Sequence, residues 1–266
     1  MKKIKDTDYL FLSSYLEAKM ARQGETAPDK SEVYRDLDRL VPDAGIVDFF
    51  RLKYDYHNAK VCLKSIAMGS ENSRLFLPYG RLKPEAIQEA YRSEDYRAFP
   101  RLFSAALRDS ADTLGRTADP RLADFVLDRA YVRELKEIAE ESGSDFLRGY
   151  ARLYADALNL KALVRMLKSG VRPELLGDIL TDCGSVSPAS LMSAYPDAAA
   201  VLQRYHATPL AQALGEAEKA AGGEGFAPFE RAVHRCLNQY MDGGKLSPFG
   251  EKVLIRYLYG IEEQSL

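Results

Sequence analysis

Two stretches of the chain carry the same polar residue types at the same spacing, in a combination that could do chemistry. The first copy consists of Asp55, Asn58, Lys60, Lys64 and Gly69, at offsets 0, +3, +5, +9 and +14. The second copy, at the same offsets and 101 residues later (156 − 55), consists of Asp156, Asn159, Lys161, Arg165 and Gly170. A carboxylate beside an amide and a basic group can act as a general acid or base, or it can hold neighbouring segments by hydrogen bonds. The agreement in order and spacing predicts an internal repeat, which is more typical of a helical scaffold than of a catalyst.

Each aspartate lies in the middle of an apolar helical stripe. On a helix, Asp55 falls in line with Leu52 and Cys62, and Asp156 has leucines at the same offsets. Burying an unpaired carboxylate costs several kcal/mol, so each aspartate needs donors from a neighbouring segment. The asparagine one turn further along is placed to join such a network. We therefore predict two buried structural clamps, formed by Asp55, Asn58, Asp156 and Asn159.

The basic residues of the two copies point away from the aspartates. Each pair is separated by four residues and lies about 140° to 180° around the helix from the aspartate, at 100° per residue. We expect these side chains to face solvent or a partner protein. The candidate partner-facing residues are Lys60, Lys64, Lys161 and Arg165.

A clamp is favoured over a general acid or base because an enzyme rarely carries one motif twice and no nucleophile accompanies it. His57 points away from the face that holds Asp55 and Asn58, and the other two histidines have no metal-ligand spacing. No phosphate-binding loop follows a predicted strand. The sequence thus indicates no catalytic residue, no cofactor and no metal. The three cysteines are scattered, which suggests a reducing cytoplasm without structural disulfides.

Composition and patterning predict an all-α protein. Charged residues make up 29% of the chain, yet the net charge is −2 and no basic tract offers a nucleic-acid footprint. No secretory signal is expected, and no apolar run reaches the roughly 18 to 20 residues of a membrane span. One body of three helical lobes is expected, at 1–92, 93–186 and 187–266. The expected helices are 6–22, 29–40, 44–68, 83–92, 97–109, 119–141, 144–169, 173–182, 187–194, 197–204, 208–221, 226–241 and 247–263.

Several segments, in order along most of the chain, match a known family. The residues 47–60, which hold the first clamp, resemble the C subunit of the rotary A-type and V-type ATP synthases, whose counterpart in the eukaryotic proton pump is the d subunit. The segments that are similar to the start of bacterial members and to the second and third repeats of that family are 5–10, 127–131, 146–150, 156–165, 229–230, 247–250 and 254–257.

The resemblance implies a funnel of three related helical lobes. In that family the closed end rests on the membrane proteolipid ring and the open end receives the central stalk. The protein would be a non-catalytic rotor part without nucleotide, cofactor or small-molecule substrate, and it would touch the membrane only through the ring. It would lie on the cytoplasmic face and couple ATP turnover to ion transport, including proton transport. The region before Tyr54 and the end of the chain are shorter than in the family pattern, which would leave the first and third lobes incomplete.

Two other functions compete with this rotor hypothesis. The first is a generic helical-repeat scaffold or adaptor unrelated to ion transport, whose lobes would stack without threefold closure. The second, less favoured, is an acid–base hydrolase that uses Asp55 or Asp156. The hydrolase predicts one aspartate exposed in a pocket beside a second titratable group.

Overall fold

The protein is all-helical, as the sequence predicts. The computed structural model describes residues 6–22, 29–42, 44–70, 73–170, 173–243 and 251–263, and every regular element within these ranges is a helix. None of the helices in this part of the chain is both long enough and apolar enough to cross a membrane.

The chain divides into two compact units. The first unit takes Met1–Asp95, Glu137–Ser144 and Met241–Leu266. Its helices are η1 (Asp6–Tyr9), α1 (Leu10–Arg22), α2 (Lys30–Leu40), α3 (Ala44–Met68), η2 (Ser73–Leu75), α4 (Pro84–Ser93) and α13 (Glu251–Glu263).

The second unit takes Tyr96–Lys136 and Asp145–Tyr240. Its helices, of which α6 and α12 end in residues counted with the first unit, are α5 (Arg101–Thr117), α6 (Pro120–Glu141), α7 (Asp145–Ser169), η3 (Pro173–Leu175), α8 (Leu176–Ile179), α9 (Pro188–Ala194), α10 (Ala198–Gln203), η4 (Pro209–Ala213), α11 (Leu214–Ala221) and α12 (Phe226–Gly243). The division into three lobes at 1–92, 93–186 and 187–266 stays a prediction.

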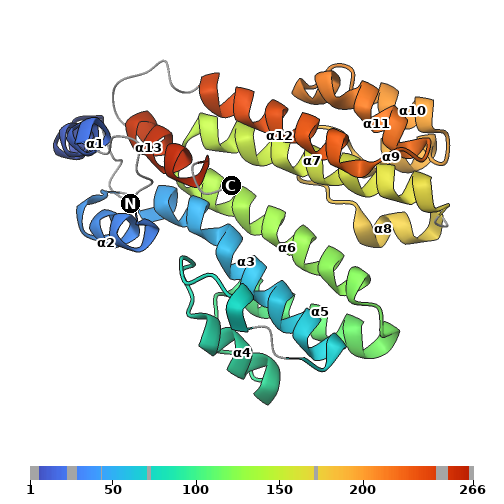
Figure 1. The fold of residues 1–266 in the computed structure, drawn as a ribbon, viewed down its shortest axis with the longest axis horizontal. Coiled ribbons are helices and arrows are strands. Elements are labelled where there is room, and N and C mark those ends of the chain that lie inside the picture. The colour runs from blue at the N-terminus through green and yellow to red at the C-terminus, as the bar shows by residue number, and fades with distance from the viewer. Residues whose placement is uncertain are drawn as a thin grey trace. The chain divides into compact units, whose positions relative to one another are not determined.

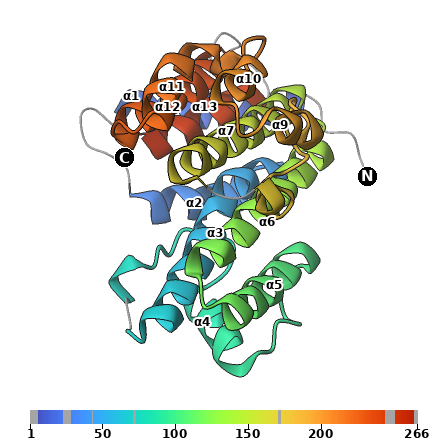
Figure 2. The same cartoon turned by 90° about the vertical axis from the view of Figure 1, so that its right-hand side faces the viewer.

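Each unit is built around one long helix that carries a copy of the polar signature. In the first unit α3 packs against α2, α4 and α13 (Figure 1). In the second unit α7 packs against α10 and α11, which Figure 2 shows from the side. Both long helices have 25 residues, and each is followed directly by a glycine, Gly69 and Gly170, with φ of 60° and 61°. The left-handed conformation of these two glycines is the one expected of residues that close a helix.

Most predicted helix boundaries agree with the structure to within a few residues, and two do not. The helix predicted at 97–109 begins after Pro100 and runs on to Thr117. Its polar stretch does not break it, because the buried hydroxyl of Ser110 donates to the carbonyl of Leu107 at 2.9 Å within the helix. The helix predicted at 173–182 stops at Ile179, since the backbone of Thr181 bonds to a side chain of α7 instead. Residues 247–250 of the last predicted helix lie outside the described residues.

All three cysteines are buried and free. Cys62 is a small core residue of α3, and burial raises the pKa of its thiol to about 12. A thiol with so high a pKa is a poor nucleophile at neutral pH.

Candidate functional site

The first copy of the signature lies in the core of the first unit and binds the loop that follows η2. Asp55 is fully buried, and its Oδ1 accepts the backbone N–H of Leu82 at 3.0 Å. Its Oδ2 accepts Nε of Arg81 at 2.7 Å. Asn58, also fully buried, donates to the carbonyl of Leu77 at 2.9 Å and accepts the N–H of the same residue at 2.9 Å. The two side chains together hold residues 77–82 against α3.

The second copy makes matching contacts in the second unit. Asp156 is 1% exposed, and its Oδ1 accepts the backbone N–H of Val186 at 3.0 Å. Its Oδ2 accepts both the N–H of Ser185, at 3.0 Å, and the hydroxyl of that residue. Asn159 forms the same reciprocal pair as its counterpart, with the carbonyl of Thr181 at 2.8 Å and its N–H at 2.9 Å. Residues 181–186 are thereby held against α7.

A glycine lies at the same point of both loops because the carboxylate comes too close for a side chain. A Cβ added to Gly80 would lie 2.2 Å from Oδ1 of Asp55, and one added to Gly184 would lie 2.2 Å from Oδ1 of Asp156. The two loops keep one register, since 184 − 80 and 186 − 82 both equal 104. The clamps therefore share two backbone donors and their glycine as well as their aspartate and asparagine.

The clamps differ in charge. Asp55 is neutralised by Arg81, whereas the residue in that position of the second loop is Ser185, and every donor recorded for Asp156 is neutral. Tyr205 is fully buried near Asp156, and both burial and the charge of that carboxylate raise the pKa of its phenol. The first clamp is thus a buried ion pair and the second a buried anion held by neutral groups.

This geometry contradicts the acid–base hydrolase hypothesis. That hypothesis requires an aspartate exposed in a pocket, and both carboxylates are covered and already occupied by hydrogen-bond donors. His57 is exposed, and its Nε2 lies 2.8 Å from the carbonyl of Leu75, away from the aspartate. Among the described residues there is no group of acidic, histidine or cysteine side chains suited to hold a metal ion.

The four basic residues of the signature lie in different environments. Lys60 is half-buried and Lys64 is exposed on α3. Lys161 is half-buried on α7, and burial lowers the pKa of its ammonium group. Arg165 is exposed, pairs with Glu230 at 2.9 Å and lies 4.9 Å from the ring centre of Phe226.

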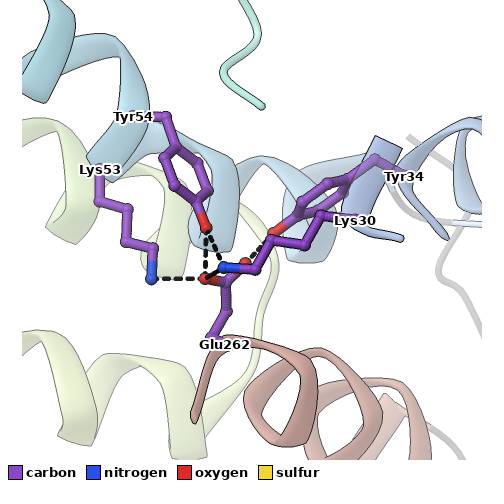
Figure 3. Close-up of polar contacts among 5 residues, drawn as sticks. All are labelled: Lys30, Tyr34, Lys53, Tyr54 and Glu262. Carbon is purple, nitrogen blue, oxygen red and sulfur yellow. Dashed lines mark hydrogen bonds and ion pairs between the residues drawn. The ribbon is translucent and has the colours of Figure 1, made fainter. Parts of the chain in front are cut away.

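The first unit also contains a buried acid that the sequence analysis did not single out. Glu262, near the end of α13, is 5% exposed and lies among four polar side chains of α2 and α3 (Figure 3). Lys30 and Lys53 reach its Oε2 at 2.9 and 2.6 Å. Tyr34 donates to its Oε1 at 2.5 Å, and Tyr54 donates to its Oε2. We call these five residues the Glu262 cluster.

The charge of Glu262 is favoured by its neighbours. Burial alone would raise the pKa of the carboxyl, but the ammonium group of Lys53 and the hydrogen bonds of Tyr34 and Tyr54 outweigh it, so the pKa lies below its usual value. Burial, together with the nearby carboxylate, raises the pKa of both phenols. Burial lowers the pKa of Lys53. The cluster is therefore a charged anchor for α13 at neutral pH.

Two features of these sites could have been found in the sequence. The first is the second half of each clamp, because Gly80 and Pro84 recur 104 positions later as Gly184 and Pro188. The second is Glu262, which lies four and eight residues after two leucines of α13 that are fully buried. That spacing puts the carboxylate on the buried stripe of the helix, the same signal that identified Asp55.

Comparison with known proteins shows which family the chain is similar to. A family model described as ATP synthase (C/AC39) subunit matches residues 2–263. The C subunit of the V-type ATP synthase of Thermus thermophilus is 24% identical over 238 residues, which cover 86% of this chain and 70% of the Thermus protein. The C subunit of the V-type sodium ATPase of Enterococcus hirae is 19% identical over 171 residues, which cover 64% of this chain. That match spans about half, 52%, of the Enterococcus protein.

Proposed function

The chain belongs to the ATP synthase C/AC39 subunit family, and from this premise we propose that it is the non-catalytic rotor subunit of a V-type or A-type ATPase. In this role it joins the central stalk to the membrane proteolipid ring. It transmits torque between them and so couples ATP turnover to ion transport or to ATP synthesis. It lies on the cytoplasmic face and meets the membrane through the ring.

The observation that carries this proposal is the family match over residues 2–263, which takes in both clamps and the Glu262 cluster. A torque-bearing part must resist deformation, and buried hydrogen-bonded networks restrict how packed segments can shift against each other. Each unit has such a network on its central long helix. The sites hold structure together and offer no exposed reactive group, which supports a mechanical role.

A pull-down of the tagged chain from its native membranes, with mass spectrometry of the recovered proteins, tests the proposal. We expect the ATPase head, the stalk proteins and the proteolipid ring among them. Recovery of a folded chain without any of these components would refute the proposal and favour a generic helical scaffold.

We further propose that the basic residues on the second halves of α3 and α7 face the partner proteins of the complex. Lys64 is exposed, and no acidic residue follows Asp55 on α3 or Asp156 on α7. The double variant Lys60→Glu and Lys64→Glu should reduce recovery of the stalk or the ring in the same pull-down. The matched control reverses two exposed charges of α5, Arg108→Glu and Arg116→Glu, and should leave recovery unchanged. Equal recovery with both double variants would exclude α3 as part of this interface.

A further inference from the structure

The Glu262 cluster is linked to the first clamp through Tyr79 and Arg51, whose side chains contact the cluster and lie on or bind the loop that the clamp holds. The ring of Tyr79, from the loop that Asp55 and Asn58 hold, meets the ring of Tyr54 edge-on at 5.4 Å between centres. The ammonium group of Lys30 lies 5.7 Å from the ring centre of Tyr79 and 5.4 Å from that of Tyr54. A cation over aromatic faces is attracted to them, and more strongly where water is excluded. The clamp loop thus forms part of the surroundings of the cation that binds Glu262.

Arg51 makes a second link between the two sites. Its guanidinium donates to the carbonyls of Tyr79 and Gly80 at 3.2 and 2.7 Å, on the loop of the first clamp. The same group lies 5.3 Å from the ring centre of Tyr34, whose hydroxyl donates to Glu262. The position that corresponds to Arg51 on α7 is Arg152, which is exposed. Among the described residues, Arg152 makes no matching link around Asp156.

The last helix is also part of the core of the first unit. On α13, Leu254 and Leu258 are fully buried, and Val253, Ile255 and Ile261 are nearly so. At its first residue, Glu251 accepts the hydroxyl of Ser144 at 2.7 Å. The helix is thus held by polar contacts near both of its ends, and Glu262 supplies the one nearer the chain terminus.

We propose that Glu262 is a positioning residue that couples α13 to the first clamp, so that α2, α3, the 77–82 loop and α13 deform as one body. The proposal rests on the proposed rotor function, for which it names the residue that carries load from the last helix into α3. The clamp of Asp156 lies in the other unit, and we expect no such coupling between it and Glu262.

Amide hydrogen exchange of the full chain tests the coupling. In Glu262→Gln the amide keeps the shape of the side chain but loses the charge that two ammonium groups and two phenols surround. Exchange in α2, α13 and the 77–82 loop should become faster by roughly tenfold or more, because a buried ion cluster has lost its anion. Peptides of α9–α11 should stay within about twofold of the wild type. Glu89→Gln, an exposed member of an ion pair on α4, is the control and should change neither region.

Double variants separate coupling from simple destabilisation. Residues of one network show non-additive effects, whereas distant independent sites do not. In the double variant Glu262→Gln with Asp55→Asn, exchange should be accelerated by at least about threefold less than the product of the two single-variant factors. In Glu262→Gln with Asp156→Asn, the acceleration should equal the product of the two factors. If Asp55→Asn does not fold, Tyr79→Leu is used in its place. In a protein that carries Tyr79→Leu, adding Glu262→Gln should accelerate exchange in α2 and α13 but not in the 77–82 loop. Multiplicative effects with Asp55→Asn or Tyr79→Leu, or acceleration in α13 alone, would overturn the proposal.

Ion transport in membrane vesicles tests the mechanical part. In the assembled ATPase, Glu262→Gln should lower the number of ions moved per ATP hydrolysed, while Glu89→Gln should not. A normal ratio with Glu262→Gln present in the complex would refute a role in load transfer. Failure of the wild-type chain to join any ATPase would instead refute the proposed function, so the two failures are distinguishable.

Discussion

Removing the carboxylate of Asp55 should destabilise the protein more than removing that of Asp156. The substitution Asp55→Ala leaves the backbone N–H of Leu82 without its acceptor and the guanidinium of Arg81 without its counter-ion. The substitution Asp156→Ala leaves only neutral donors, two backbone N–H groups and one hydroxyl. A buried cation without its partner is costlier than a buried neutral donor without an acceptor.

The magnitudes follow from burial. Breaking a buried ion pair costs about 3–5 kcal/mol, and because the Arg81 side chain is still 16% exposed and partly hydrated, we expect the lower end, about 3 kcal/mol. For Asp156→Ala, the unsatisfied neutral donors lead us to expect about 2 kcal/mol. The substitution Asp145→Asn should lower the free energy of unfolding by less than about 1 kcal/mol, because this side chain is 98% accessible and its ion pair with Arg148 lies at the surface.

Thermal unfolding followed by far-UV circular dichroism measures these differences. For a chain of this size 1 kcal/mol shifts Tm by roughly 2–4 °C, so Asp55→Ala should lower it by about 6–12 °C and Asp156→Ala by about 4–8 °C. Hydrogen exchange in the same variants should place the loss in the unit that carries the substitution.

A double variant tests the physical reason. Since much of the loss in Asp55→Ala comes from breaking the ion pair with Arg81, adding Arg81→Leu should recover about 1 kcal/mol or more. A Tm for Asp55→Ala within about 2 °C of the wild type would refute the clamp. A double variant less stable than Asp55→Ala would refute the role assigned to the arginine.

Three further predictions concern other residues. Gly80→Ala and Gly184→Ala should each lower the free energy of unfolding by about 1–3 kcal/mol, because the added Cβ meets a carboxylate oxygen. Gly115→Ala, where nothing lies within 4 Å of the added Cβ, should not lower it, and equal stability of all three variants would contradict the close approach. The pKa of Glu262 is lowered in the native state, so the unfolded chain binds its proton first as pH falls below the usual value of 4.5. The stability advantage of the wild type over Glu262→Gln should therefore shrink as pH falls through that window, and a constant difference in free energy of unfolding from pH 7 to pH 3 would show that the native state does not lower this pKa. The thiol of Cys62, with its pKa near 12, should resist alkylation at pH 7.5 until the chain unfolds, and rapid labelling of the native protein detected by mass spectrometry would disprove its burial.

For the clamps, residue spacing predicts the burial of the aspartates but not the groups that bind them. A carboxylate on an apolar helical stripe must find donors, so burial of Asp55 and Asp156 followed from their spacing alone. The identity of the donors did not follow. They include backbone N–H groups of loops about 20 to 30 residues further along, which no residue type marks, together with the side chains of Arg81 and Ser185. Only the paired glycines hinted at the close approach.

Helix ends show the same limit. The helix expected at 97–109 runs on to Thr117, and the hydroxyl of Ser110 is satisfied within it. The helix expected at 173–182 stops at Ile179, and the backbone of Thr181 is bound to Asn159. In both cases hydrogen bonds of the folded chain, from Ser110 to Leu107 and between Thr181 and Asn159, accompany the observed conformation.

The sequence by itself determined that this protein is helical, that two of its helices carry the same polar signature, and that it resembles the C/AC39 family, since periodicity and residue order are properties of the linear chain. Only the tertiary structure decided that the first clamp is an ion pair and the second is not. It also decided that Glu262 meets Lys30, more than 200 residues away in the chain, beside the loop of the first clamp. These outcomes depend on which segments pack together, and the burial that results changes the energy of each charge more than its sequence neighbours do.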